Sequence, residues 1–291
     1  MKKLYVLFSI FMLISSLGLA KVSKNEKKAL IALYNSTNGA HWIRKWDLKK
    51  PVAEWYGVKV VDDKVVEINL FHNNLMGPLP VGISKLENLK VLNLAFNSIT
   101  GELPEDLVFL TNLKVLKLEM NRLKGGIPNN IGGLSNLEEL TAFNNFLSGS
   151  IPESIGEISN LKILNLSSNA LKGTIPNSLG QLAHLETLGL FENTLEGSIP
   201  SEIGHLTKLK ELVLANNSLN GEIPEEFNQL ASLQIFQIQN NNFSSFKNLE
   251  KLKTREYLVF DYDGFDKKYE FKELKLERTR MADTKYEDIE N

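Results

Sequence analysis

The chain has 291 residues, of which 43% are hydrophobic and 23% charged, and 33 lysines and arginines nearly balance 35 aspartates and glutamates. These proportions suit a globular protein and exclude a collagen or a disordered chain. The formal charge of −2 leaves no basic surplus for the phosphate contacts that nucleic-acid binding needs. The absence of cysteine excludes disulfides, thiolate metal sites and a cysteine nucleophile.

Residues 1–20 have the features of a secretory signal peptide. Lys2 and Lys3 precede an apolar run, and small residues follow where a signal peptidase would cut. The apolar run, residues 4–14, is shorter than the roughly twenty residues that cross a bilayer, so a membrane anchor is the weaker interpretation. We predict an exported chain that begins near Lys21, has no membrane span after cleavage, and is periplasmic, at the cell surface or secreted.

The next segment, residues 21–64, is predicted to begin with a helix and to act as a cap. Its residues 24–34 place their apolar side chains on one side of a helix. Three tryptophans follow, at Trp42, Trp46 and Trp55. Large aromatic side chains can cover the open apolar end of a stack of repeats, and repeats follow directly. An exposed aromatic platform for a carbohydrate is the alternative role for these tryptophans.

Residues 65–248 consist of a 24-residue repeat. Its eight copies begin, without an insertion, at Val65, Leu89, Leu113, Leu137, Leu161, Leu185, Leu209 and Leu233. The pattern is L-x-x-L-x-L-x-x-N-x-L-x-G-x-I/L-P-x-x-I/L-G-x-L-x-N, and its period and first half are typical of a leucine-rich repeat solenoid. We therefore expect an α/β fold, a curved right-handed solenoid of eight coils with a parallel sheet on its concave face.

Each coil divides into a strand half and a turn half. The fourth and sixth residues are apolar and alternate with mostly polar ones, which predicts a short strand that buries one face. The second half supplies a glycine for a bend, a proline that fixes φ, and apolar residues three to four apart. This half is expected to form a short helical turn on the outer face.

The ninth residue of every coil is asparagine. These residues are Asn73, Asn97, Asn121, Asn145, Asn169, Asn193, Asn217 and Asn241. The chain turns inward at this position, where buried backbone donors and acceptors need partners, and a side-chain amide offers both a donor and an acceptor. We expect a structural asparagine ladder rather than a ligand site.

Residues 249–291 are predicted to form a second cap and a tail. Residues 257–271 favour a hairpin around Asp263-Gly264, a dipeptide suited to a two-residue turn. The aspartates near this turn lack the glycine position and the distal glutamate of an EF-hand calcium loop. Turn chemistry is therefore preferred, and no metal site is predicted.

No catalytic or cofactor-binding constellation stands out in the sequence. The four histidines are scattered, and there is no nucleophile elbow, phosphate-binding loop or dinucleotide-binding motif. Paired carboxylates such as Glu138 and Glu139 have no apolar setting that would raise a pKa. We predict a non-enzymatic protein without cofactor or metal, whose function lies on a surface.

The third, fifth, seventh and eighth residues of each coil are expected to project onto the concave face. The candidate ligand-binding residues there are Phe71, His72, Phe96, Met120, Phe143 and Phe191, with Phe146, next to a ladder asparagine, as a further candidate. The five large apolar residues at the seventh and eighth positions would form a track that suits an extended peptide or the edge of a protein partner. The alternative, that each one covers only its neighbours, needs no ligand.

The half-repeat L-x-G-x-I-P-x-x-I/L-G-x-L resembles the plant-type leucine-rich repeat of plant receptor ectodomains and polygalacturonase-inhibitor proteins, and of secreted bacterial proteins that share it. The likeness covers residues 65–242 and extends to the cap, where Trp55, Gly57 and Val58 match W-x-G-V. Plant members pin that cap with paired cysteines, which this chain lacks, so a bacterial relative is indicated.

This resemblance implies a module that binds a protein or peptide on its concave face. The alternative partner is a glycan, since the family includes inhibitors of polysaccharide-degrading enzymes. The sequence therefore predicts a binding module, with a cell-surface glycan binder or such an inhibitor as the second possibility.

Overall fold

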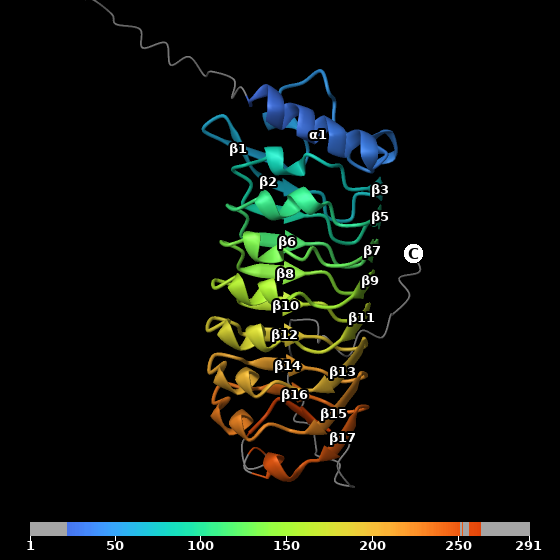
Figure 1. Ribbon diagram of the computed structural model, residues 1–291. Coiled ribbons are helices and arrows are strands. Elements are labelled where there is room, and N and C mark those ends of the chain that lie inside the picture. The colour runs from blue at the N-terminus through green and yellow to red at the C-terminus, as the bar shows by residue number, and fades with distance from the viewer. Residues whose placement is uncertain (1–21, 251, 253–255, 263–291) are drawn as a thin grey trace, which may run out of the picture.

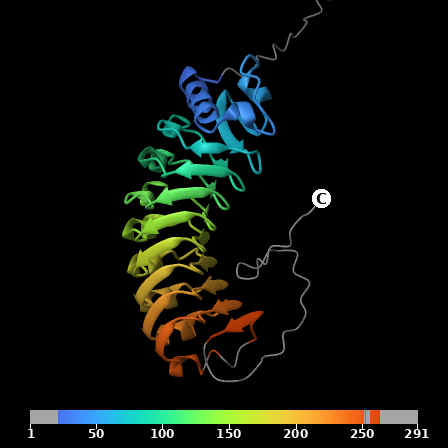
Figure 2. The same ribbon diagram turned by 90° about the vertical axis from the view of Figure 1, so that its right-hand side faces the viewer.

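A curved stack of coils makes up the fold, as Figures 1 and 2 show. The computed structural model describes residues 22–250, 252 and 256–262. The predicted signal peptide lies outside these residues, as does the turn of the predicted hairpin with everything that follows it. The predicted solenoid of eight 24-residue coils with a parallel sheet on its concave side is confirmed. No helix in the described part of the chain is long and apolar enough to cross a membrane.

The N-terminal cap begins with helix α1 (Lys24–Ser36), close to the predicted bounds. A capping box starts it, because the Ser23 hydroxyl accepts a hydrogen bond from the Glu26 amide while the Glu26 carboxylate accepts one from the Ser23 amide. The second carboxylate oxygen of Glu26 accepts a hydrogen bond from the amide of Val65 at 3.0 Å. One buried carboxylate thus starts the helix and ties it to the first coil.

The three tryptophans of the cap are buried, and their interpretation as a carbohydrate platform is wrong. Trp46 stacks on Trp55 with ring centroids 4.8 Å apart, and Trp42 meets Trp46 edge-on at 4.9 Å. Each indole nitrogen donates to a backbone carbonyl at 2.8–3.0 Å, so none is free for a ligand. They form the apolar lid over the first coil.

The ten-stranded sheet takes one strand from each coil, with β1 of the cap at one end and β18 at the other. Strand β1 (Val58–Val61) pairs antiparallel with β2 (Lys64–Asn69) through a two-residue turn at Asp62-Asp63, where both residues have positive φ. The remaining strands pair in parallel, in the order β2, β4 (Val91–Asn93), β6 (Val115–Lys117), β8 (Glu139–Thr141), β10 (Ile163–Asn165), β12 (Thr187–Gly189), β14 (Glu211–Val213), β16 (Ile235–Gln237) and β18 (Val259–Asp261). Strand β1 therefore covers the edge that the first coil would otherwise expose.

A second, eight-stranded parallel sheet lies beside the first, and the sequence analysis did not predict it. Its strands are β3 (Met76–Pro78), β5 (Ser98–Gly101), β7 (Arg122–Gly125), β9 (Phe146–Gly149), β11 (Ala170–Gly173), β13 (Thr194–Ser198), β15 (Ser218–Glu222) and β17 (Asn242–Ser245). Strands β3 to β15 contain the glycine of the predicted bend, whereas β17 has Ser245 at that position, so the bends of the coils also pair with one another in a short parallel sheet.

The predicted helical turns are 3₁₀ turns on the convex side, opposite the ten-stranded sheet (Figure 2). Those of the coils are η3 (Ile83–Lys85), η4 (Glu105–Phe109), η5 (Ile131–Gly133), η6 (Glu153–Glu157), η7 (Asn177–Gln181), η8 (Ser201–His205), η9 (Glu225–Gln229) and η10 (Lys247–Leu249). Two more, η1 (Gly39–His41) and η2 (Val52–Glu54), belong to the cap. Their apolar residues and the strand leucines share one continuous core.

The ninth-position asparagines join each coil to the one before it. The amide nitrogen of Asn145 donates to the carbonyls of Ala142 and Phe143 in its own coil, and to that of Leu118 in the preceding coil. Its oxygen accepts from the amide of Leu123 at 3.0 Å. The same four bonds recur from the second coil to the eighth, and in the first coil Asn73 bonds the backbone of Arg44 in the cap.

The C-terminal end adds a ninth rung. Strand β18 pairs in parallel with β16, with Phe260 opposite Phe236 and their ring centroids 5.3 Å apart. Tyr262 packs on Phe246 at 5.3 Å, which covers the end of the last coil. The first arm of the predicted hairpin thus continues the repeat, while Asp263-Gly264 lies outside the described residues.

Replacing Asn145 with leucine is expected to lower the free energy of unfolding by about 3 kcal/mol, because buried backbone groups that lose a partner cost about 1–3 kcal/mol each. Thermal and urea unfolding would measure the change. The matched control is Asn220→Leu at an exposed position of β15, which is expected to change stability by less than about 0.5 kcal/mol. Equal stability of the Asn145 variant and the unmodified chain would contradict the structural role of the ladder.

Candidate ligand-binding face

The concave face is built from the ten-stranded sheet and from the residues that leave each strand. Within each strand the fourth residue of the coil is buried in the core, and the third and fifth residues point to the opposite, concave side. The strands align in exact steps of one coil, so that Val91 lies opposite Val115 and Glu139 opposite Ile163. Side chains at equivalent positions therefore form rows along the solenoid.

The eighth residue of every coil has a left-handed backbone, with φ between 47° and 57°. These residues are His72, Phe96, Met120, Asn144, Ser168, Glu192, Asn216 and Asn240. In each coil up to the seventh, the amide of this residue donates to the seventh-position carbonyl of the next coil, as Phe96 does to Glu119 at 2.9 Å. The neighbouring coil thus maintains a conformation that is uncommon for residues other than glycine.

Two exposed phenylalanines form an aromatic pair at the N-terminal end of the face. Phe71 is 48% exposed and Phe96 is 41% exposed, and their ring centroids lie 5.2 Å apart. His72 lies beside Phe71 with ring centroids 6.1 Å apart and is also exposed. We call Phe71 and Phe96 the aromatic shelf. The shelf presents apolar surface that no other described residue covers, which suits a ligand side chain.

The rest of the predicted apolar track is less accessible than expected. Met120, Phe143 and Phe191 are half-buried rather than exposed, and the small seventh-position residues Ala95, Ser167 and Ala215 are buried. The Met120 sulfur accepts a hydrogen bond from the side-chain amide of Asn144. The expectation of five exposed residues on the concave face is therefore wrong, because of these five only Phe71 and Phe96, in the first two coils, are exposed.

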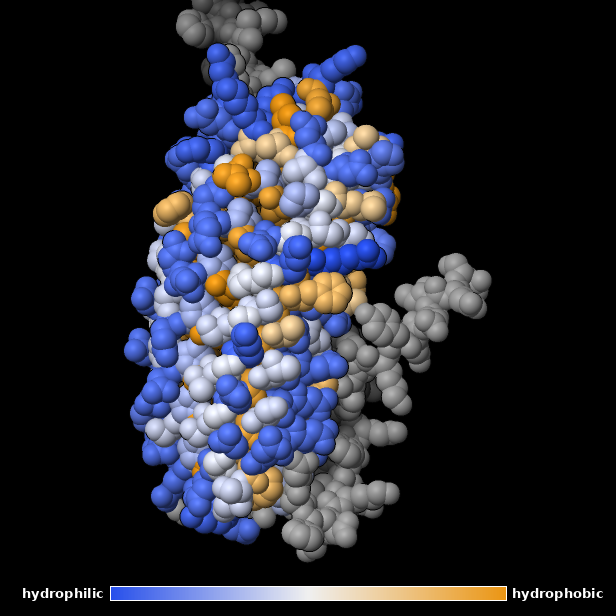
Figure 3. All heavy atoms as spheres, turned by 45° about the vertical axis from the view of Figure 1, so that its right-hand side comes forward, coloured by the Kyte–Doolittle hydropathy of each residue, from blue (hydrophilic) through white to orange (hydrophobic). Residues whose placement is uncertain are grey.

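Phe146 is the most exposed of the candidates, at 63%, but it lies in β9 of the second sheet rather than on the ten-stranded sheet. Figure 3 shows the side of the molecule that carries the second sheet, where hydrophobic groups are interspersed with hydrophilic ones. Because Phe146 lies on the second sheet, it provides a control away from the shelf.

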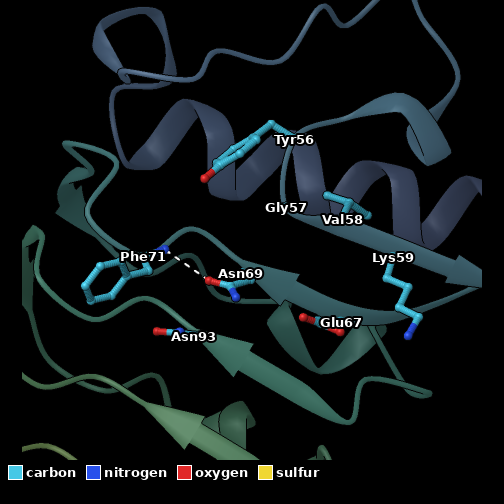
Figure 4. A pocket seen from close by; sticks show the side chains of 8 residues that line it. All are labelled: Tyr56, Gly57, Val58, Lys59, Glu67, Asn69, Phe71 and Asn93. Carbon is cyan, nitrogen blue, oxygen red and sulfur yellow. Dashed lines mark hydrogen bonds between the residues drawn. The ribbon is translucent and has the colours of Figure 1, made fainter. Parts of the chain in front are cut away.

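An open hollow of about 620 Å³ lies beside the shelf, between the cap and the first two coils. It is lined by Tyr56, Gly57, Val58, Lys59, Glu67, Asn69, Phe71 and Asn93 (Figure 4). In Figure 4 the rings of Tyr56 and Phe71 lie toward one end, and Lys59 lies at the other. The hollow therefore offers aromatic surface together with amide and charged groups, a combination that sequence reasoning did not assemble because its walls come from three separate segments.

The cap wall of the hollow is held by close backbone contacts. Gly57 has φ of 74°, and a Cβ there would collide with the carbonyl of Asn69. The carbonyl of Gly57 accepts a hydrogen bond from the amide of Asn69 at 2.7 Å. The Trp46 indole donates to the carbonyl of Tyr56 at 2.8 Å, and the Arg44 guanidinium lies 5.4 Å from the centre of the Tyr56 ring. These contacts position Tyr56 over the hollow.

A buried carboxylate lies one coil beyond the shelf. Glu119, at the seventh position of the third coil, is 8% exposed and accepts a hydrogen bond from the Thr141 hydroxyl at 2.6 Å. Burial raises the pKa of Glu119 above its ordinary value of 4.5, and the Thr141 hydrogen bond acts in the opposite direction. The nearby Lys117 is paired with Glu139 at 2.7 Å. The sequence analysis placed the seventh residue of each coil on the concave face but gave no sign that Glu119 is buried there.

The side chains of the concave face and the hollow are of kinds that bind ligands. Apolar rings, amides and carboxylates can hold a ligand by packing and hydrogen bonds. Among the described residues, no three His, Asp or Glu side chains are grouped to hold a metal ion. His41, His72, His184 and His205 lie in separate coils or in the cap, as their positions in the sequence indicate.

Models of two repeat families match the sequence. The model described as "Leucine-rich repeat region" matches residues 145–276, and the model described as "Leucine Rich Repeat" matches residues 88–110 and 112–134. None of the curated proteins matches the chain.

Solved structures of similar fold come from plants and from a bacterium. The chain is 31% identical to the ectodomain of the Arabidopsis thaliana receptor kinase GASSHO1/SCHENGEN3, solved in complex with CASPARIAN STRIP INTEGRITY FACTOR 2, with a TM-score of 0.75 over 81% of this chain and 30% of that one. It is 33% identical to the ectodomain of the Arabidopsis receptor kinase HAESA in complex with an extended IDA peptide hormone, with a TM-score of 0.67 over 81% of this chain and 41% of that one.

A leucine-rich repeat protein of Leptospira interrogans is 36% identical, with a TM-score of 0.56 over 66% of this chain and 47% of that one. The present chain therefore spans less than half the length of each of these three proteins.

Replacing Glu119 with glutamine is expected to raise the melting temperature at pH 7 by about 2–4 °C, the change that about 1 kcal/mol produces in a domain of this size. The folded pKa of Glu119 is raised, so the folded state gains stability from protonation below the ordinary pKa of 4.5 and loses it as the pH rises through the folded value. The variant and the unmodified chain should therefore converge at acid pH. A lower melting temperature of the variant at pH 7 would contradict the account.

Proposed function

The chain is a leucine-rich repeat protein of the plant type, and we propose that it is a non-enzymatic binding module whose partner is a protein or peptide held on the N-terminal part of the concave face. The observation that carries this proposal is the aromatic shelf. Two phenylalanines more than 40% exposed stand in ring contact on the concave side of a solenoid whose other concave aromatics are half-buried.

The position of the shelf supports a ligand of some length. The hollow lies on one side of Phe71, and the row of eighth-position residues continues from Phe96 along the next coils. Strands about 4.8 Å apart make these rows a regular set of contact points along the solenoid axis. An extended peptide could place one side chain on the shelf and its neighbours along the rows.

The structural relatives support the same class of ligand. The two Arabidopsis ectodomains were solved in complex with CASPARIAN STRIP INTEGRITY FACTOR 2 and with a peptide hormone, respectively. These ligands are bound by those two receptors, and the present chain covers only 30% and 41% of the lengths of the receptor ectodomains. For this chain we carry over only the class of partner, because its own shelf provides a place for it.

Export is part of the proposal and rests on residues 1–20, whose basic start and apolar run are those of a secretory signal peptide. A binding module of this kind would meet its partner in the periplasm, at the cell surface or in the surroundings. N-terminal sequencing of the protein recovered from the source cells would test cleavage near Lys21.

A glycan is the second candidate ligand, and one observation favours it. The hollow is lined by the amides of Asn69 and Asn93 and the carboxylate of Glu67, and the ring of Tyr56 lies on its cap side (Figure 4). Hydroxyl groups of a sugar would bond such side chains, and the sugar face would stack on the ring. An inhibitor of a polysaccharide-degrading enzyme would instead be found among protein partners.

Removing both rings of the shelf, as Phe71→Ala with Phe96→Ala, is expected to weaken partner binding at least about tenfold, because buried aromatic contacts commonly dominate an interface. Affinity capture from the envelope and surroundings of the source organism, with each retained protein quantified and then titrated, would measure it. Phe146→Ala is the control, since it removes an even more exposed ring that lies on the second sheet.

Partners retained equally by the double variant and by the unmodified chain would contradict the proposed face. The hollow would instead be a glycan-binding site if the chain retained a soluble oligosaccharide and no protein partner, and if Tyr56→Ala abolished this retention.

A further inference from the structure

We propose that the peptide bound by this chain ends in an aromatic residue with a free carboxylate, whose ring packs on the shelf and whose carboxylate accepts hydrogen bonds from the side-chain amides of Asn69 and Asn93. This inference rests on the proposed peptide binding and names the part of the peptide that is recognised. It is carried by the orientation of the two amides, by their distance from the shelf and by the wall that the cap forms beside them.

Two asparagines of the hollow present their amide nitrogens to a ligand. Asn69 and Asn93 hold the fifth position of the first two coils and lie opposite each other in the parallel pairing of β2 and β4. The Oδ1 atom of Asn69 accepts a hydrogen bond from the backbone amide of Phe71 at 3.4 Å, and that of Asn93 accepts one from the backbone amide of Ala95 at 3.2 Å. The oxygens are thus bound to the backbone, and neither NH2 group donates to another residue of the described chain.

Two such donors on neighbouring strands fit one carboxylate. Adjacent strands lie about 4.8 Å apart, and a carboxylate oxygen accepts a hydrogen bond from an N–H group at about 2.9 Å. A carboxylate placed between the two side chains can therefore accept one bond on each of its oxygens. A hydroxyl or a carbonyl group offers one oxygen and no charge, so it would be held less strongly by the same pair of donors.

The distance from the amides to the shelf matches the dimensions of one aromatic residue. Phe71 follows Asn69 by two residues, which is at most about 7 Å along the backbone. A phenylalanine residue holds its ring centre about 5 Å from its carboxylate carbon. The last residue of a peptide can therefore reach the amides with its carboxylate and the shelf with its ring.

The charges that line the hollow balance each other. Lys59 and Glu67 are its charged lining residues, and they lie opposite each other in the antiparallel pairing of β1 and β2. Lys117, the next fifth-position residue after Asn93, is already paired with Glu139 at 2.7 Å. A ligand carboxylate would thus meet an ammonium group together with a carboxylate, and the hydrogen-bond donors rather than a surplus of charge would select it.

The cap makes the hollow suitable for the end of a chain. Strand β1 is the last strand of the ten-stranded sheet on this side, and residues 56–59 line the hollow on its cap side (Figure 4). A peptide that runs along the coils toward the cap meets this wall beside Asn69 and Asn93. Because the free groups of both asparagines are donors, they fit a terminal carboxylate and not a terminal ammonium group.

A peptide array tests this proposal with the purified chain. Ten-residue peptides are attached through their N-termini, have randomised internal residues and end in phenylalanine, tyrosine or alanine. Each is made with a free C-terminal carboxylate and with a C-terminal amide, and the tightest binders are titrated in solution. We expect the acid that ends in an aromatic residue to bind at least about tenfold more tightly than its amide.

Variants of the two asparagines assign the preference to the hollow. Asn69→Asp with Asn93→Asp keeps the oxygens that bond to the backbone but replaces both donors with carboxylate oxygens. This double variant should lose the preference for the acid and still bind the amide peptide within about threefold, which also shows that it is folded. Asn220→Asp makes the same change at an exposed position of β15 and should leave both affinities unaltered.

A second array distinguishes the two ends of a peptide. Its peptides are attached through their C-termini and carry either a free or an acetylated N-terminus. We expect no preference for the free amine. Tighter binding of the free amine that is lost on Glu67→Gln would show that the hollow captures an ammonium group, and would overturn the proposal.

The outcomes separate this inference from the proposed function. Equal binding of the acid and the amide by the unmodified chain, or a preference for the acid that survives in the double variant, would overturn carboxylate recognition and leave peptide binding in place. Failure of the unmodified chain to bind any peptide of either array would overturn peptide binding itself, and the inference with it.

Discussion

Each coil of this protein depends on the next to satisfy the backbone groups at its inward turn. One asparagine per coil supplies that link, with its amide nitrogen bonded to three carbonyls and its oxygen to one amide, as at Asn145. A coil alone would leave those groups buried without partners, at a cost of about 1–3 kcal/mol each. The ladder therefore requires a complete stack, and the ends need separate solutions: Asn73 bonds to the cap at Arg44, and β18 adds a rung at the other end.

The same constraint shapes the surface available for binding. Because neighbouring coils fix the backbone at the eighth position, with φ between 47° and 57°, the side chain there can vary from serine to phenylalanine while the turn stays the same. The shelf and the buried Glu119 both arise from side chains that differ at equivalent positions of the same repeated backbone. Function in this fold is accordingly a matter of which side chains occupy a regular set of positions.

The periodic parts of the fold could be predicted from the sequence because each template residue makes the same contact in every coil. The strands, the outer turns and the asparagine positions follow from that period. The second sheet was missed because its strands are only three to five residues long. Most of them, such as β5 at Ser98–Gly101, contain glycine, and they lack the alternation of apolar and polar residues that marks a strand. The β1–β2 hairpin was missed for a similar reason, since its turn is Asp62-Asp63 rather than a glycine-containing pair.

The candidate site was only partly predictable, because exposure depends on neighbours 22 to 24 residues away. Phe71 and Phe96 were correctly placed on an accessible face, whereas Phe143 and Phe191 are half-buried. Glu119 is buried, and its hydrogen-bond partner Thr141 lies one coil later. The tryptophans illustrate the same limit. The sequence alone does not distinguish an aromatic residue that covers the first coil from one that binds a carbohydrate, whereas the burial and hydrogen bonds of the three indoles do.

The most direct test of the proposed binding site is to map where the natural partner contacts the molecule. A photo-reactive benzoyl-phenylalanine placed at position 71, and in a separate preparation at position 146, would be illuminated in the source cells and the linked proteins identified. The account predicts one partner linked from position 71 and absent from position 146. Linkage of the same partner from position 146 alone, or equally from both positions, would contradict a binding site on the concave face.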